Sequence, residues 1–137
     1  MTNIVISGAN GKMGKVINSV ISAREDCKVI AGIDINTETY ADFPIVTNPS
    51  ELPEKPDVII DFSNLSWSKE LKKCRKKKIA WIHGSFLFFK SAGLLKKILA
   101  TNYNKIVCLS NSLKKDIIKT EPKLINKLSV IYNPINQ

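Results

Sequence analysis

The feature that most constrains this chain is a glycine-rich turn, Gly8-Ala9-Asn10-Gly11-Lys12-Met13-Gly14. It follows the short apolar run Asn3–Ser7, which is typical of a buried strand. It opens a segment with helical periodicity, Gly11–Ala23. We expect one face of this helix to carry Val16, Ile17, Val20 and Ile21. Glycines at this spacing let a strand turn sharply into a helix that packs closely on it, so the pattern predicts the start of a strand–helix–strand unit.

Strand-like and helix-like segments continue to alternate along the chain. The expected strands are Asn3–Ser7, Lys28–Ile33, Ile45–Val46, Asp57–Phe62, Ile79–His83, Ile106–Leu109 and Leu128–Tyr132, and the expected helices are Gly11–Ala23, Ser66–Lys78, Phe88–Thr101 and Ser112–Lys119. This alternation indicates right-handed crossovers and a parallel sheet covered on both faces. We therefore predict an α/β fold, a Rossmann-like doubly wound parallel sheet with strand order 3-2-1-4-5-6, as a single domain over residues 1–137.

The glycine turn also predicts a site for the pyrophosphate of a dinucleotide. Without a Cβ, glycine lets the backbone approach phosphates, and the amino end of the next helix offers free N–H groups and a positive dipole end. Asp34 ends the second expected strand, twenty residues after Gly14, where a carboxylate can accept hydrogen bonds from ribose hydroxyls. The alternative is a turn with a purely structural role.

Residues 4–63 resemble the coenzyme domain of bacterial dihydrodipicolinate reductase, an enzyme of lysine biosynthesis. The resemblance is carried by Gly8–Gly14, by Ala31-Gly32-Ile33-Asp34 and by Asp57-Val58-Ile59-Ile60-Asp61-Phe62-Ser63. It implies hydride transfer from NADH or NADPH to a cyclic dicarboxylate, with the nicotinamide beside Phe62 and Ser63. The candidate cofactor-binding residues are Gly8, Asn10, Gly11, Lys12, Met13, Gly14, Asp34, Phe62 and Ser63.

The expected cofactor is NADH rather than NADPH. Residues 35–43 contain no Arg or Lys to hold a 2′-phosphate, and the Asp34 carboxylate would repel one, so Lys12 is the one basic side chain that we expect nearby. The reductase family has a Gly-Thr-Thr turn after its fifth strand, where this chain has Ile82-His83-Gly84-Ser85. Binding is therefore expected to be weak, about 0.1–1 mM. The family's His-His pair with a Lys also has no counterpart, so we assign no catalytic residue and expect this chain alone to be inactive.

Residues 66–136 resemble a second family, the family-four GT-B glycosyltransferases. The resemblance is carried by Trp81-Ile82-His83-Gly84, by Ile106-Val107-Cys108-Leu109-Ser110-Asn111-Ser112 and by the stretch from Leu128 to Asn136. It implies the end of an acceptor-binding domain without the donor domain that follows. We expect a chimera, engineered or naturally fused, of a reductase-like half (1–65) and a glycosyltransferase-like half (66–137). In that case the chain is a scaffold without its own activity. A single divergent domain is the alternative.

The charge changes sign close to this expected join. Residues 1–68 hold five basic and nine acidic side chains, and residues 69–137 hold sixteen and three, which gives net charges of −4 and +13. A basic half attracts phosphate backbones, but it has no recognition motif and no interleaved aromatic platform. Nucleic acid is therefore not an expected partner.

Composition sets the remaining expectations. The chain has 137 residues with 44% hydrophobic and 24% charged, which is typical of one globular domain that needs no disulfide or metal. Three scattered cysteines fit neither a disulfide framework nor a zinc site, so no metal is expected. Apolar runs fall short of the ~18 residues of a membrane span, and the first residues lack the basic start of a signal peptide. We therefore expect a cytoplasmic protein with no membrane partner.

Overall fold

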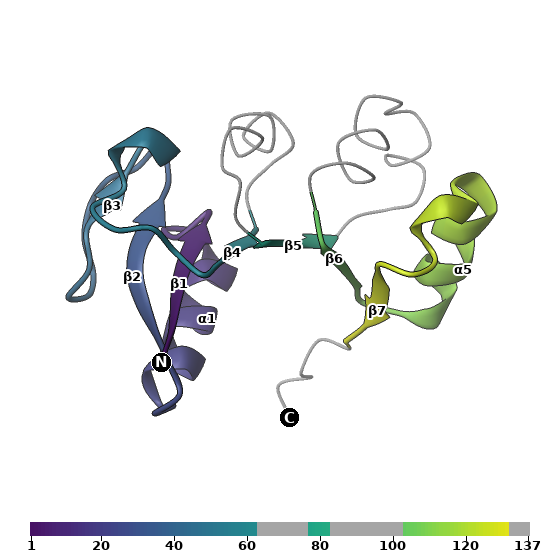
Figure 1. The fold of residues 1–137 in the computed structure, drawn as a ribbon, viewed down its shortest axis with the longest axis horizontal. Coiled ribbons are helices and arrows are strands. Elements are labelled where there is room, and N and C mark those ends of the chain that lie inside the picture. The colour runs from purple at the N-terminus through teal and green to yellow at the C-terminus, as the bar shows by residue number, and fades with distance from the viewer. Residues whose placement is uncertain (63–76, 83–102, 132–137) are drawn as a thin grey trace. The chain divides into compact units, whose positions relative to one another are not determined.

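The chain divides into two compact units, residues 1–78 and residues 79–137 (Figure 1). The computed structural model describes residues 1–62, 77–82 and 103–131. The prediction of a single domain, with halves 1–65 and 66–137, is not tested by this division and stays a prediction.

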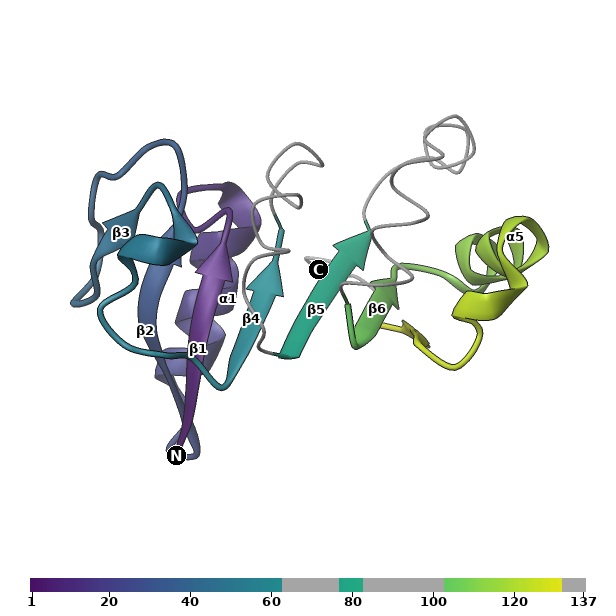
Figure 2. The ribbon, with the colours of Figure 1, turned by 45° about the horizontal axis from the view of Figure 1, so that its top comes forward.

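The first unit contains a parallel sheet. Its strands are β1 (Thr2–Ser7), β2 (Cys27–Ile33), β3 (Ile45–Val46) and β4 (Val58–Asp61). They lie in the order β3-β2-β1-β4, and the pairs β1–β2, β1–β4 and β2–β3 are all parallel (Figure 2). The strand order reverses at β1, as predicted, and this reversal is where ligands bind in open α/β sheets.

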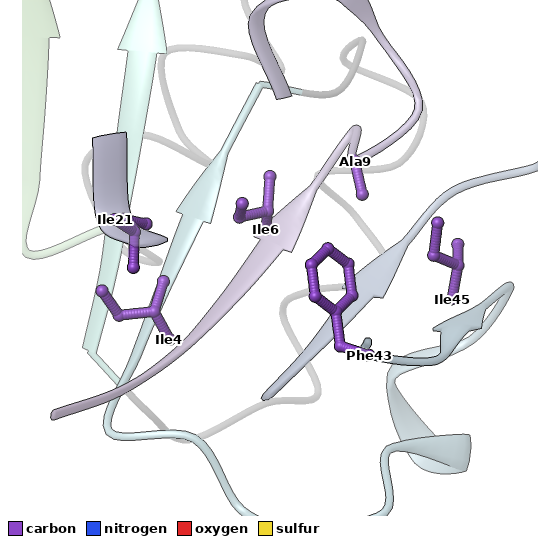
Figure 3. Close-up of a cluster of buried hydrophobic side chains, with 6 residues drawn as sticks. All are labelled: Ile4, Ile6, Ala9, Ile21, Phe43 and Ile45. Atoms are coloured by element: carbon purple, nitrogen blue, oxygen red, sulfur yellow. The ribbon is translucent and has the colours of Figure 1, made fainter. Parts of the chain in front are cut away.

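Apolar side chains of β1 point alternately to the two faces of the sheet. Ile4 and Ile6 pack with Ala9, Ile21, Phe43 and Ile45 in one buried cluster (Figure 3). Val5 packs on the other face in a cluster that also contains Ala31, Ile33 and Ile59. A strand that is buried on both faces is typical of a parallel sheet, which explains the uninterrupted apolar run in the sequence.

The helix α1 (Lys12–Ser22) is rotated relative to the prediction. Gly14 and Ile21 are buried, whereas Val16 and Val20 are 43% and 59% exposed. A Cβ on Gly14 would lie 2.4 Å from the carbonyl oxygen of Gly8, so the helix backbone is in direct contact with the turn at this position. The predicted apolar face is therefore buried at Ile21 and partly buried at Ile17 but exposed at Val16 and Val20, because the close approach at Gly14 fixes which side of the helix faces the sheet.

The second unit repeats the parallel arrangement. Its strands are β5 (Lys77–Ile82), which begins in the last two residues of the first unit, β6 (Lys105–Cys108) and β7 (Leu128–Val130). β6 pairs in parallel with both β5 and β7. The buried residues of the second unit include Ile106, Ile117, Leu124 and Leu128.

Short helices connect the strands of both units. The 3-10 helix η1 (Pro49–Glu51) precedes β4. In the second unit, α5 (Asn111–Thr120) and the 3-10 helix η3 (Pro122–Leu124) lie between β6 and β7. Ser110 caps α5, since its Oγ accepts a 3.1 Å hydrogen bond from the N–H of Leu113. Ser110 is thus the N-cap of the helix, and Ser112 lies inside its first turn.

The predicted α/β, Rossmann-like fold with parallel strands is confirmed. The expected helix Phe88–Thr101 lies outside the described residues, and so does most of Ser66–Lys78. The end of that second helix was wrong, because Lys77 and Lys78 begin β5. Lys78 and Ala80 are buried at alternate positions, which is the spacing of a strand face. Strand packing therefore overrides the helical preference of the lysine run.

Candidate functional site

The glycine turn lies at the carboxyl end of β1 and is attached to the end of β2. Gly8 has a φ of 83°, in the left-handed region that favours glycine. The N–H groups of Gly8 and Ala9 donate to the carbonyl oxygen of Ile33 at 2.8 and 3.3 Å. Gly8 and Gly14 are therefore required by the fold, one for its backbone conformation and the other for the close approach of α1.

The amino end of α1 is open. Gly11 is its N-cap, with no side chain to cap the helix, and the Gly11 N–H donates to the Gly8 carbonyl at 3.1 Å. The N–H groups of Lys12, Met13 and Gly14 make no hydrogen bond to any residue that the structure describes. The first turn carries no acidic side chain. Three amide donors and the positive end of the helix dipole are thus available to an anion.

Gly11 differs from the other two glycines of the turn. It is exposed, and a Cβ built on it would meet a single neighbour within 4 Å, the Gly8 carbonyl oxygen at 3.2 Å. Packing within the described part of the chain therefore leaves room for a small side chain here. Gly11 is also the N-cap, directly before the three free amides of the helix.

Asp34 lies within hydrogen-bonding distance of the turn. Its Oδ2 accepts a 2.8 Å hydrogen bond from the N–H of Asn10, and its Oδ1 accepts a 3.2 Å hydrogen bond from the N–H of Asn36. An ionised carboxylate offers about four acceptor positions, so these two bonds leave capacity for hydroxyl donors. The structure thus brings Asp34 and the glycine turn together as predicted, and its role toward a ribose stays a prediction.

Residues 34–40 form a second loop that is tied to the glycine turn. The Asn10 side-chain amide donates to the carbonyl oxygens of Asn36 and Glu38 at 2.5 and 2.9 Å. The Tyr40 hydroxyl donates to the carbonyl oxygen of Ala9 at 2.7 Å. These bonds join positions 26 to 31 residues apart, and no motif in the sequence links them.

Tyr40 was not among the predicted site residues. Its ring packs edge-on against Phe43 with centroids 5.7 Å apart, and the Lys15 Nζ lies 5.3 Å from its centroid. Burial, and to a smaller extent the negative charge of Asp34, raises the pKa of Tyr40. The hydroxyl therefore stays protonated and able to donate to Ala9 at neutral pH.

The remaining predicted site residues divide between described and undescribed parts of the chain. Lys12 is exposed and Met13 is half-buried at the open end of α1. Phe62 follows β4, next to β1, and its N–H donates to the Ser7 carbonyl at 2.9 Å, which places it at the same edge of the sheet as the turn. Ser63 lies outside the described residues, as does His83.

The part of the chain that the structure describes contains neither a metal-binding cluster nor a membrane-spanning helix. Within residues 1–62, 77–82 and 103–131, no three His, Cys, Asp or Glu side chains gather as a metal site would require. Over the same ranges, no helix has the length and apolar character needed to cross a membrane.

Comparison with known proteins relates the chain to one family. The family model described as "Dihydrodipicolinate reductase, N-terminus" matches residues 2–111. A 4-hydroxy-tetrahydrodipicolinate reductase from Caldanaerobacter subterraneus subsp. tengcongensis is 40% identical over 80 residues, covering 58% of this chain and 32% of the relative. The corresponding reductase from Clostridium novyi is 36% identical over 77 residues, covering 51% and 31%. The matched part thus spans about a third of each relative's length.

A solved structure with the same fold comes from Paenisporosarcina sp. TG-14 and is a dipicolinate-bound dihydrodipicolinate reductase. It superposes with a TM-score of 0.53 at 16% identity, covering 81% of this chain and 48% of that chain. The family match extends from residue 2 to residue 111 and so covers both sides of the expected join between residues 65 and 66. These comparisons give the glycosyltransferase resemblance and the chimera no support, and both stay predictions.

Proposed function

The chain belongs to the family of dihydrodipicolinate reductase N-terminal domains, and we propose that it binds NADH through its glycine turn and Asp34. The observation that carries the proposal is the open amino end of α1. Three consecutive amides, those of Lys12, Met13 and Gly14, face no acceptor among the described residues. A diphosphate supplies the acceptors and the negative charge that these amides and the helix dipole favour.

The surroundings of Asp34 favour NADH over NADPH. Its carboxylate is fixed beside the turn by two backbone N–H groups, so a 2′-phosphate on the ribose would meet a fixed negative charge. Residues 35–43 contain no cation to offset it. The Lys15 ammonium lies over the Tyr40 ring, and Lys12 is exposed at the start of α1.

We propose further that the chain is the coenzyme-binding part of a 4-hydroxy-tetrahydrodipicolinate reductase of lysine biosynthesis, acting in the cytoplasm. NADH supplies a hydride when it is bound. In this proposal the turn binds the pyrophosphate, Asp34 orients the adenosine ribose, and Phe62 and Ser63 lie toward the nicotinamide. The relatives' remaining two-thirds of the sequence would hold the substrate, so no residue of this chain is assigned a catalytic role.

Titration with each dinucleotide tests the proposal. NADH fluorescence or calorimetry on the 137-residue chain should give a dissociation constant of about 0.1–1 mM, with NADPH weaker. Gly11→Val should abolish binding of both, because its branched side chain occupies the space in front of the helix amides. Thermal unfolding of this variant controls for loss of fold. Tighter binding of NADPH, or unchanged binding by folded Gly11→Val, would contradict the proposal.

A further inference from the structure

We propose that Asn10 is a positioning residue that sets the preference for an unphosphorylated ribose, by clamping residues 34–38 against the glycine turn. The inference rests on the proposed binding of NADH. It extends the explanation of this preference from Asp34 to Asn10, the residue that holds Asp34 in place.

Asn10 uses all three of its N–H donors on this segment. Its backbone N–H binds Asp34 Oδ2 at 2.8 Å. Its side-chain amide binds the carbonyl oxygens of Asn36 at 2.5 Å and Glu38 at 2.9 Å. One residue of the turn therefore fixes three residues of the following loop.

The orientation of the Asp34 carboxylate depends on Asn10 twice. Asn10 binds Oδ2 directly, and it also fixes Asn36, whose N–H binds Oδ1 at 3.2 Å. The side-chain oxygen of Asn36 in turn accepts the N–H of Glu38 at 3.0 Å. Loss of the Asn10 side chain would remove two of the three bonds by which Asn10 holds this network, and its backbone bond to Asp34 would remain.

The clamp fixes the Asp34 carboxylate, and it holds the backbone of Glu38, which carries a second acidic side chain. Asp34 lies beside the turn, and Glu38, which is exposed, lies on the clamped segment. Fixed charges discriminate against an added phosphate more strongly than mobile ones, which can move away and become screened by solvent. An unclamped loop should therefore lose part of its affinity for ribose hydroxyls and part of its repulsion of a 2′-phosphate.

The test compares Asn10→Ala with wild type in the full chain, titrated with NADH and with NADPH. We expect the NADH dissociation constant to rise about tenfold, the effect of losing one to two hydrogen bonds, and that of NADPH to change less than about twofold. Asn18→Ala, at a position in the middle of α1, is the matched control and should leave both constants unchanged. Amide exchange without cofactor should be faster at Asn36 and Glu38 in Asn10→Ala.

The outcomes separate this inference from the proposed function. Equal weakening of both dinucleotides by Asn10→Ala would show a merely structural role and overturn the inference alone. Unchanged binding of NADH by Asn10→Ala, or unchanged amide exchange at Asn36 and Glu38, would also overturn the inference alone. A wild-type chain that binds neither dinucleotide would overturn the proposed function and this inference together.

Discussion

Gly14 approaches Gly8 so closely that a Cβ on Gly14 would lie 2.4 Å from the Gly8 carbonyl oxygen. A Cβ on Gly11 would lie 3.2 Å from that same oxygen, with no other neighbour within 4 Å among the described residues. The two glycines therefore meet different requirements. Gly14 allows α1 to pack against the turn, whereas no such close packing among the described residues requires Gly11.

Substitution at Gly14 should destabilise the fold much more than substitution at Gly11. Gly14→Ala forces its methyl group against the backbone oxygens of Gly8 and Ala9, which should lower the free energy of unfolding by about 1–3 kcal/mol or more. Gly11→Ala should cost about 0.5 kcal/mol as a poorer N-cap. Urea denaturation of both variants measures the difference. Equal stabilities would show that the close approach at Gly14 is relaxed in solution.

Asp34→Asn should lower stability and narrow the difference between NADH and NADPH. An amide side chain has one acceptor oxygen for two backbone donors, Asn10 N–H and Asn36 N–H, so one hydrogen bond is lost, which costs about 0.5–1.5 kcal/mol. Loss of the charge also removes the repulsion of a 2′-phosphate. Urea denaturation and paired titrations measure the two effects. Asp42→Asn is the control, because Asp42 is an exposed carboxylate in the same segment between β2 and β3. An equal effect of this substitution would argue against a specific role for Asp34.

The sequence contains most of the information needed for the first unit. Strands β1 and β2 and the turn between β1 and α1 are local patterns, so their positions were predicted within a residue or two. The placement of Asp34 beside the turn followed from the parallel pairing of β1 with β2. Such features depend on short-range spacing and on one general rule about parallel sheets.

Tertiary contacts determine two features that the sequence did not reveal, namely the rotation of α1 and the hydrogen bonds between the two loops. The rotation of α1 depends on the contact between Gly14 and Gly8, which outweighs the apolar character of Val16 and Val20. The bonds from Asn10 and Tyr40 join two loops across 24 to 31 residues. Asparagine and tyrosine are ordinary loop residues. A single sequence therefore does not reveal that Asn10 bonds to residues 34–38 or that Tyr40 bonds to Ala9.

The purified chain should not oxidise NADH in the presence of the relatives' substrate. In the proposed function the turn binds the cofactor, and we assign no residue of this chain a role in holding the substrate or donating a proton. Absorbance of NADH over time measures the reaction, with a full-length reductase as the positive control. Turnover that disappears with a substitution in residues 1–137 would show that the chain contains catalytic residues.

Cys108 should resist alkylation in the folded chain. Its thiol is buried in β6, and burial raises its pKa to about 11, so the reactive thiolate is scarce at pH 8. Cys27, which is half-buried, should react faster. Iodoacetamide labelling followed by peptide mapping measures both, and labelling in urea provides the control in which Cys108 reacts fully. Rapid labelling of Cys108 without urea would indicate frequent opening of the second unit.

Tyr40→Phe should destabilise the chain at neutral pH by about 0.5–1.5 kcal/mol, because the Ala9 carbonyl loses its 2.7 Å hydrogen bond while the ring contacts with Phe43 and Lys15 remain. Burial and the charge of Asp34 raise the pKa of Tyr40 above its ordinary value of 10, so the unfolded chain loses this proton first as pH rises. Wild type therefore has the full contribution of Tyr40 below pH 10 and loses it as pH increases through the raised pKa. The stability difference between wild type and Tyr40→Phe should accordingly shrink above pH 10 in urea denaturation at several pH values. A difference that widens there would mean that the Tyr40 hydroxyl ionises more readily in the folded chain than in the unfolded one, which would contradict its role as a donor to Ala9.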